Sequence, residues 1–145
     1  MIRLKDFPDH HDAELVMKLY DLRREAIMRE SRSAVNGKFW PKNAEEATAV
    51  TKSDSPLHAA FRQVSTYWEM AYGMAKHGVL HTEFMLESNG EGIYLFARVE
   101  PYLADFRKLN PRAFKNAEWI TTECEDGRHL LDVYRARVQQ VLASK

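Results

Sequence analysis

The segment between residues 57 and 75 constrains the fold most, because its apolar side chains repeat with the period of an α-helix. Apolar residues stand at offsets 0, 3, 4, 7, 10, 11, 14, 17 and 18 from Leu57. This series places them on one face of a long helix. Ser55-Pro56 is typical of a helix start and Gly78 of the residue just past a helix end. The sequence therefore predicts a long helix with one buried face.

Other segments show the same periodicity. One amphipathic helix is predicted from about 12 to 33, with Asp9 or Asp12 as its cap. Asn43 and Glu46 resemble a capping box and predict a short helix over about 44–51. Two more helices are predicted towards the C-terminus, one starting at Asn110-Pro111 and the last from about 126 to 143.

The stretch from 82 to 99 fits two local structures. Asn89-Gly90 between two apolar runs is a hairpin signal. The runs are continuous rather than alternating, so two short helices separated by Asn89-Gly90 fit equally well. The helices on both sides favour the helical interpretation, with Pro101 kinking or restarting the second helix.

These segments, in a chain of 145 residues, predict an all-α fold: a compact single-domain helical bundle with one or two short accessory helices. Residues 1–145 form one domain in this prediction, with 1–11 and 144–145 loosely ordered. No linker is long enough to separate two domains.

The composition bears on compartment and partners. Lys plus Arg and Asp plus Glu each number 21, and no tail carries one sign. This balance argues against nucleic-acid binding by a concentrated basic face, although segregation in space stays open. One cysteine, no signal-peptide core and no apolar run near ~20 residues predict a soluble cytoplasmic protein with no membrane span.

Sequence motifs for chemistry are missing. The chain holds no Glu-x-x-His, no His-Glu-x-x-His and no glycine-rich phosphate loop. His77 and His81 have the spacing of two metal ligands, but Gly78 between them is expected to end the helix. Cys124 lies on an apolar stripe among acidic neighbours, which favours a buried structural cysteine over a nucleophile paired with His129. We therefore predict no metal, no cofactor and no catalytic residue, and the chain is interpreted as non-enzymatic.

Two sets of residues are candidates for binding. A small-ligand pocket between helices, in a binding protein or an enzyme, would use Arg23, Glu69, Tyr72 and Tyr94 as polar contacts. A buried Arg23 is expected to pair with an acid such as Glu69 or Glu100. The aromatic pair Phe39 and Trp40 is expected to pack over the core, with an interface in a homo-oligomer as the alternative. The first hypothesis for function is thus an interaction or self-association module.

Several segments resemble a family of small uncharacterised bacterial helical proteins over about residues 12 to 140. They are Leu19-Tyr20-Asp21-Leu22-Arg23-Arg24-Glu25, Phe39-Trp40-Pro41, Phe61-Arg62-Gln63-Val64 with Tyr67-Trp68, and Asn89-Gly90-Glu91-Gly92. The family has no assigned reaction, so the resemblance implies an all-α fold and supplies no site residue.

Overall fold

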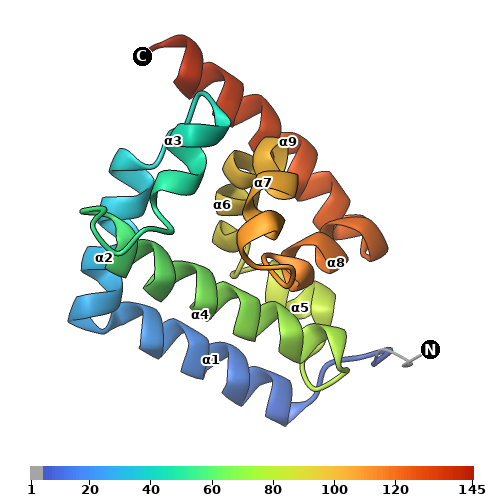
Figure 1. Cartoon of the computed structure of the whole chain (residues 1–145). Helices are drawn as coiled ribbons and strands as arrows, with labels where there is room; N and C mark the ends of the chain where they lie inside the picture. Colours follow the sequence, from blue (N-terminus) through green and yellow to red (C-terminus); the bar gives the residue numbers. More distant parts are fainter. Residues whose placement is uncertain (1–4) are drawn as a thin grey trace.

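Two long helices, α4 and α9, organise the computed structural model, which describes residues 5–145 (Figure 1). α4 packs against α2 and α8, and α9 packs against α6 and α8. The described residues contain no strand. The helices are α1 (His10–Arg24), α2 (Ala26–Lys38), α3 (Ala44–Ala49), α4 (His58–Lys76), α5 (Thr82–Leu86), α6 (Glu91–Val99), a 3₁₀ helix (Glu100–Tyr102), α7 (Leu103–Leu109), α8 (Lys115–Glu123) and α9 (Glu125–Ala143). The predicted all-α class is confirmed.

The helical interpretation of 82–99 is confirmed, and α6 lies at the centre of the fold. Seven of its nine residues are buried, which explains its continuous rather than alternating apolar run. Gly92 allows α6 to approach α4 closely, because a Cβ there would lie 2.6 Å from the Tyr72 hydroxyl and 2.7 Å from the Trp68 ring. Pro101 stands in the 3₁₀ helix that links α6 to α7.

The single helix predicted over 12–33 is wrong. The backbone of Glu25 is extended (φ −58°, ψ 141°), and its carboxylate accepts a hydrogen bond from Met28 N at 2.9 Å. Glu25 therefore caps a new helix, and α2 turns away from α1 and packs against α4 (Figure 1). The apolar period continues across the break, so periodicity alone does not reveal it.

Two predicted helix starts are also displaced. Ser55 Oγ accepts from Leu57 N at 3.2 Å, and Asn110 Oδ1 accepts from Arg112 N at 3.1 Å. Each Ser/Asn-Pro pair thus closes a turn, and the helix begins a few residues later, α4 at His58 and α8 at Lys115.

The ends of the predicted helices are otherwise close to the expected positions. Asp9 is the N-cap of α1 and Gly78 has a positive φ of 74° just past α4. Asn43 caps α3 through Glu46 N, although Glu46 itself accepts from Lys42 N rather than Asn43 N. Residues 1–4, part of the segment predicted to be loosely ordered, lie outside the described residues. No helix of residues 5–145 has the length and apolar character needed to cross a membrane.

Candidate functional site: a cationic groove along α4

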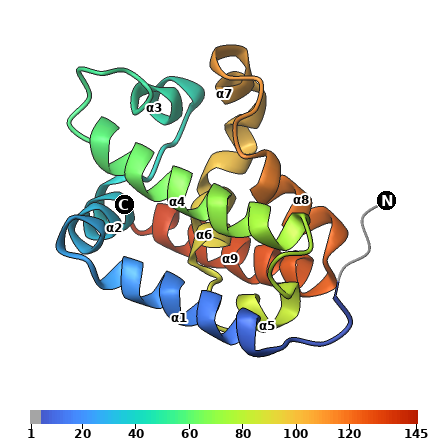
Figure 2. The same ribbon diagram turned by 90° about the horizontal axis from the view of Figure 1, so that it is seen from below.

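An open groove of about 970 Å³ runs along one face of α4, which we call the cationic groove. Its lining comes from residues 50–52, from the α4 face between His58 and His77, and from residues 106–116. Figure 2 shows α3 and α7 standing on the same side of α4, so that the ends of both helices border this face.

The spacing of the α4 residues explains why one face is left uncovered. The opposite face carries the buried side chains predicted from the periodicity, Val64, Trp68 and Ala71 among them. The groove face follows an i, i+3/i+4 series of mostly polar residues, which are His58, Phe61, Arg62, Ser65, Thr66, Glu69, Lys76 and His77. From His58 to Glu69 this face is about 17 Å long at the rise of an α-helix. Beyond Glu69 the side chain of Asn116 packs against Gly73 and donates to the Glu69 carbonyl at 2.9 Å, so α8 covers this part of α4.

An aromatic cluster forms the apolar part of the groove. The ring centroids of Phe61, Phe106 and Phe114 lie 6.0, 6.1 and 5.8 Å apart, and all three residues are buried. Phe114 reaches the cluster from a left-handed backbone conformation (φ 57°) just before α8. Leu109, at the end of α7, is 62% exposed and leaves an aliphatic surface at the groove.

Five cationic side chains surround this apolar area, and they are Lys52, Arg62, Lys76, Arg112 and Lys115. Within residues 5–145 none of the five has a carboxylate oxygen within 4.0 Å. The one carboxylate in the described lining is Glu69. A chain with zero formal charge has therefore gathered an excess of positive charge on one face.

The carboxylate of Glu69 caps the start of α8. Its two carboxylate oxygens accept from Asn116 N at 3.1 Å and Ala117 N at 2.9 Å, at the start of α8. Burial raises the pKa of Glu69 above its ordinary value, although these two N–H donors and the nearby cations Arg107 and Lys76 oppose the rise. Glu69 thus holds α8 against α4 and neutralises only part of the groove.

Arg23 is buried, but the predicted pairing with an acid is wrong. Its guanidinium donates to the side-chain oxygen of Asn89, to the Tyr67 hydroxyl at 3.3 Å and to the Ser88 carbonyl at 3.4 Å. The two proposed acids are engaged elsewhere, because Glu69 caps α8 and Glu100 pairs with Arg135. The acceptor for Arg23 is instead Asn89, which is fully buried before α6 and is held there by the bond from its amide nitrogen to the Met85 carbonyl at 3.0 Å.

The four residues predicted for a pocket do not meet in one place. The Tyr72 hydroxyl donates to the Asn89 carbonyl at 2.9 Å, so Tyr72 and Arg23 share Asn89 as a partner. Tyr72 is fully buried, and burial raises its pKa well above the ordinary value. Tyr94 instead packs on Trp40 and Tyr134, and Glu69 is the one predicted residue in the cationic groove.

Arg98 is a buried cation that sequence reasoning missed. It is 2% exposed and donates to the Val35 and Phe39 carbonyls, both at 3.1 Å, and to Asn36 Oδ1 at 2.9 Å. It thereby satisfies the Phe39 carbonyl just past the end of α2 and adds a second donor to the Val35 carbonyl, which also accepts from Phe39 N at 2.9 Å. Burial lowers its pKa to about 10. The available signal was one arginine inside the otherwise apolar run of α6.

Phe39 is buried against Phe61, with ring centroids 5.1 Å apart, as the core alternative expects. Trp40 is half-buried and lines a second open groove of about 940 Å³ beside Pro41, Tyr102 and Leu142. Its role at an interface stays a prediction.

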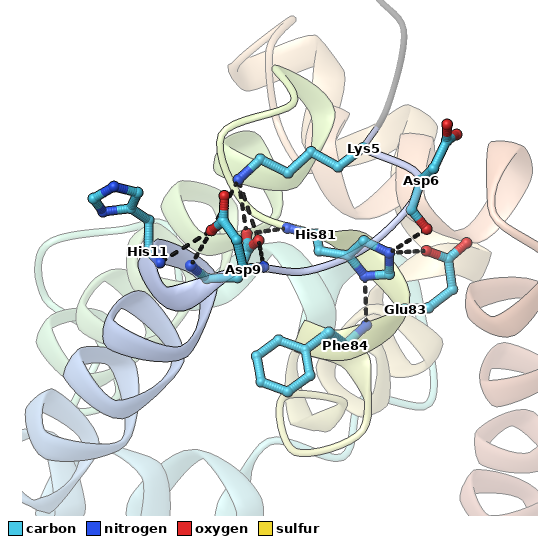
Figure 3. Close-up of polar contacts among 8 residues, drawn as sticks. Lys5, Asp6, Asp9, His11, His81, Glu83 and Phe84 are labelled. Atoms are coloured by element: carbon cyan, nitrogen blue, oxygen red, sulfur yellow. Dashed lines mark hydrogen bonds and ion pairs between the residues drawn. The ribbon is translucent and has the colours of Figure 1, made fainter.

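The N-terminal segment is fastened to α5 by buried polar contacts (Figure 3). Asp12 is fully buried and accepts from Lys5 Nζ at 3.1 Å, Asp9 N at 2.8 Å and His81 N at 2.8 Å. The His81 ring accepts from Phe84 N at 3.1 Å and so caps α5. We call this set the Asp12 cluster.

The histidines and the cysteine that the sequence analysis considered for metal binding or catalysis lie in other surroundings. Among the described residues no group of three His, Cys, Asp or Glu side chains is placed to hold a metal ion. His81 belongs to the Asp12 cluster, while His77 faces the cationic groove. Cys124 is buried, and burial raises the pKa of its thiol, as expected for a structural cysteine.

The groove cations were not singled out by the sequence, because they come from separate segments that only packing brings together.

Fold and site together define an all-helical protein with an open, cationic and partly apolar surface. The chain belongs to the family described as "Domain of unknown function (DUF4760)", whose model matches residues 8–124. No curated protein and no solved structure matches the chain.

Proposed function

We propose that this chain is a non-enzymatic binding module that recognises an anionic ligand in the cationic groove. The observation that supports the proposal is the set of five cations that have no carboxylate partner among residues 5–145 and that surround an apolar floor. Like charges held on one face repel one another, and a bound anion relieves this repulsion.

The residues of the groove suit recognition better than reaction. Its carboxylate, Glu69, is occupied by two backbone N–H groups. The cations are exposed or half-buried, so their side chains are free to adjust to a ligand. These are the properties of a surface that binds through charge and apolar contact.

Binding of inorganic tripolyphosphate, followed by amide shifts in NMR spectra, tests the proposal. We expect the shifts to cluster at residues of the groove and the affinity to fall as salt rises. The double variant Arg62→Glu/Lys115→Glu is expected to bind about tenfold more weakly, because two cations become anions and the net charge of the groove falls by four units. Lys18→Glu/Arg29→Glu makes the same change of charge on α1 and α2 and serves as the control. Shifts spread evenly over the surface, or an equal loss in the control, would contradict the proposal.

A second candidate is self-association through the groove that Trp40 lines. Two aromatic residues, Trp40 and Tyr102, stand there beside Pro41, Pro101 and Leu142. Aromatic residues are enriched at the centres of protein interfaces. Light scattering tests this candidate, and a strictly monomeric protein at high micromolar concentration would reject it.

A further inference from the structure

We propose that the natural occupant of the cationic groove is an acidic amphipathic helix of a partner protein. This inference rests on the proposed function and names the chemical class of the ligand. It requires three properties of the groove, namely the length of a helix, an apolar strip, and positive charge from more than one side.

The length of the groove suits a short helix. The continuous part of the α4 face that lines it, from His58 to Glu69, runs about 17 Å, the length of roughly three helical turns. Small side chains, Ser65 and Thr66, stand in the middle of this face. Small residues at a helix surface let a second helix approach closely, so a partner helix can pack against the centre of the groove.

The apolar strip and the charges are arranged for an amphipathic partner. Leu109 offers an exposed aliphatic surface, and the buried phenylalanine cluster lines the same groove. The five cations arise from the α3–α4 loop, from α4 itself, and from the start of α8 and the turn before it. A helix with apolar residues at i, i+3, i+4 and i+7 and carboxylates beside them would match both features.

The same details argue against a nucleic acid. Single-stranded nucleic acids bind by stacking bases on exposed aromatic faces. The three phenylalanine rings of the groove pack against one another and are 3–8% exposed, so none of them offers a free face. The exposed apolar side chain, Leu109, is aliphatic and suits a leucine or isoleucine of a protein partner.

An enclosed small-molecule site fits less well. Pockets for small ligands bury most of the ligand surface in a cleft or cavity. The cationic groove is open to solvent, and its cations are exposed or half-buried. An extended ligand contacts more of this surface than a compact one.

The test uses the full chain and three fluorescent probes of equal negative charge, measured by anisotropy. They are a 16-residue helical peptide with leucines on one face and glutamates on the other, a scrambled peptide of the same composition, and oligodeoxythymidylate. We expect the amphipathic peptide to bind about tenfold more tightly than the scrambled one, because only the first presents an apolar face.

Two pairs of variants sharpen the test. Leu109→Ser is expected to weaken binding of the amphipathic peptide severalfold, whereas Val133→Ser, at an exposed valine of α9, is expected to leave it unchanged. Arg62→Glu/Lys115→Glu is expected to weaken both peptides, and Lys18→Glu/Arg29→Glu neither. Circular dichroism of each variant verifies that the helices are intact.

The outcomes separate this inference from the proposed function. Equal binding of the two peptides, or tighter binding of the oligonucleotide, overturns the inference and leaves anion binding by the groove in place. A dimer that Arg62→Glu/Lys115→Glu dissociates identifies the occupant as a second copy and also overturns it. If none of the probes binds and tripolyphosphate gives no localised shifts, the proposed function fails as well.

Discussion

The charged residues of this protein occupy two kinds of surroundings, and the contrast separates structure from recognition. In the interior, Asp12, Arg23 and Arg98 are each 8% exposed or less and each has several hydrogen-bond partners. In the cationic groove, the cations lie at the surface without a carboxylate partner among the described residues. A buried charge must be satisfied within the fold, whereas an exposed one is available to another molecule.

The interior charges also show how a single group can hold several elements together. Arg98 is surrounded by neutral oxygens of α2 and its C-terminal end and by the rings of Trp40 and Tyr94, at 4.7 and 4.8 Å from the guanidinium carbon. The negative end of the α2 dipole compensates its charge. Removing the guanidinium takes a donor from the Val35 carbonyl, the Phe39 carbonyl and the Asn36 side chain, whereas removing a groove cation leaves no buried acceptor short of a donor.

The largest expected effect belongs to Arg98→Met, which keeps an apolar stem and removes the guanidinium. The carbonyls of Val35 and Phe39 then lose their shared donor, so we expect the free energy of unfolding to fall by about 3 kcal/mol. Chemical denaturation measures the change. Arg29→Met, at an exposed position of α2, is the control, and an equal loss in both variants would show that Arg98 has no special role.

Asp12→Asn is expected to cost about 2 kcal/mol, because the carboxylate accepts three buried or half-buried donors. Burial on its own raises the pKa of Asp12, but hydrogen bonds from His81 N, Asp9 N and Lys5 outweigh it, and the pKa lies below the ordinary value. A lowered pKa gives stability that is present above the unfolded value of about 4 and is lost as the pH falls through the folded value.

Denaturation between pH 2 and pH 7 therefore checks this second prediction. The wild-type protein should lose more stability below pH of about 4 than Asp12→Asn, since the variant has no carboxylate to protonate at this position. Asp21→Asn, an exposed position of α1, should keep the wild-type profile. Parallel profiles for the wild type and Asp12→Asn would contradict the role given to the Asp12 cluster.

Glu69→Gln is expected to affect both stability and binding, because Glu69 caps α8 within the fold and also faces the cationic groove. The amide keeps one acceptor oxygen, so we expect a loss of stability below about 1 kcal/mol. Tripolyphosphate should bind about threefold more tightly, since the groove loses its one negative charge among the described lining residues. Because the pKa of Glu69 is raised, lowering the pH towards it should strengthen binding to the wild type more than to the variant. Glu87→Gln, an exposed position outside the groove lining, should change neither measurement.

The smallest effect on stability is expected for Arg62→Glu and Lys115→Glu, each made singly. Both side chains are exposed and have no carboxylate partner among the described residues, so the free energy of unfolding should stay within about 0.5 kcal/mol of the wild type. Thermal unfolding by circular dichroism measures it. A loss of several kcal/mol in either variant would mean that these cations hold the fold, and the contrast with Arg98 would collapse.

Local patterns predicted the elements well where the signal and its physical cause lie within one or two turns. The 3.6-residue period gave the buried face of α4, and Gly78 adopts the positive φ that ends it. The same patterns failed at Glu25, where the apolar period runs through a break that capping decides. They also placed helix starts at Ser55-Pro56 and Asn110-Pro111, where turns precede the helices.

Of the residues that line the cationic groove, the sequence analysis named only Glu69 as a candidate for binding. It named Glu69 as a polar contact in a pocket, whereas in the structure Glu69 caps α8. Glu69 was expected to join Arg23, Tyr72 and Tyr94, but these three lie at other contacts within the core and around α6. Side chains on different helices converge only when the packing angles of those helices are known, and a periodic pattern carries no packing angle.

The amino-acid sequence by itself determined that this chain is all-helical, which faces of its helices are apolar and that its cysteine is buried. These properties follow from neighbours three or four residues apart, whose contacts form within one helix. The tertiary structure alone decided that Lys52, Arg62, Arg112 and Lys115 share one groove and that Arg98 closes the end of α2. These residues are far apart in the sequence, and they come together only because the helices that carry or flank them pack in this arrangement. Such packing depends on the whole fold and not on neighbouring residues.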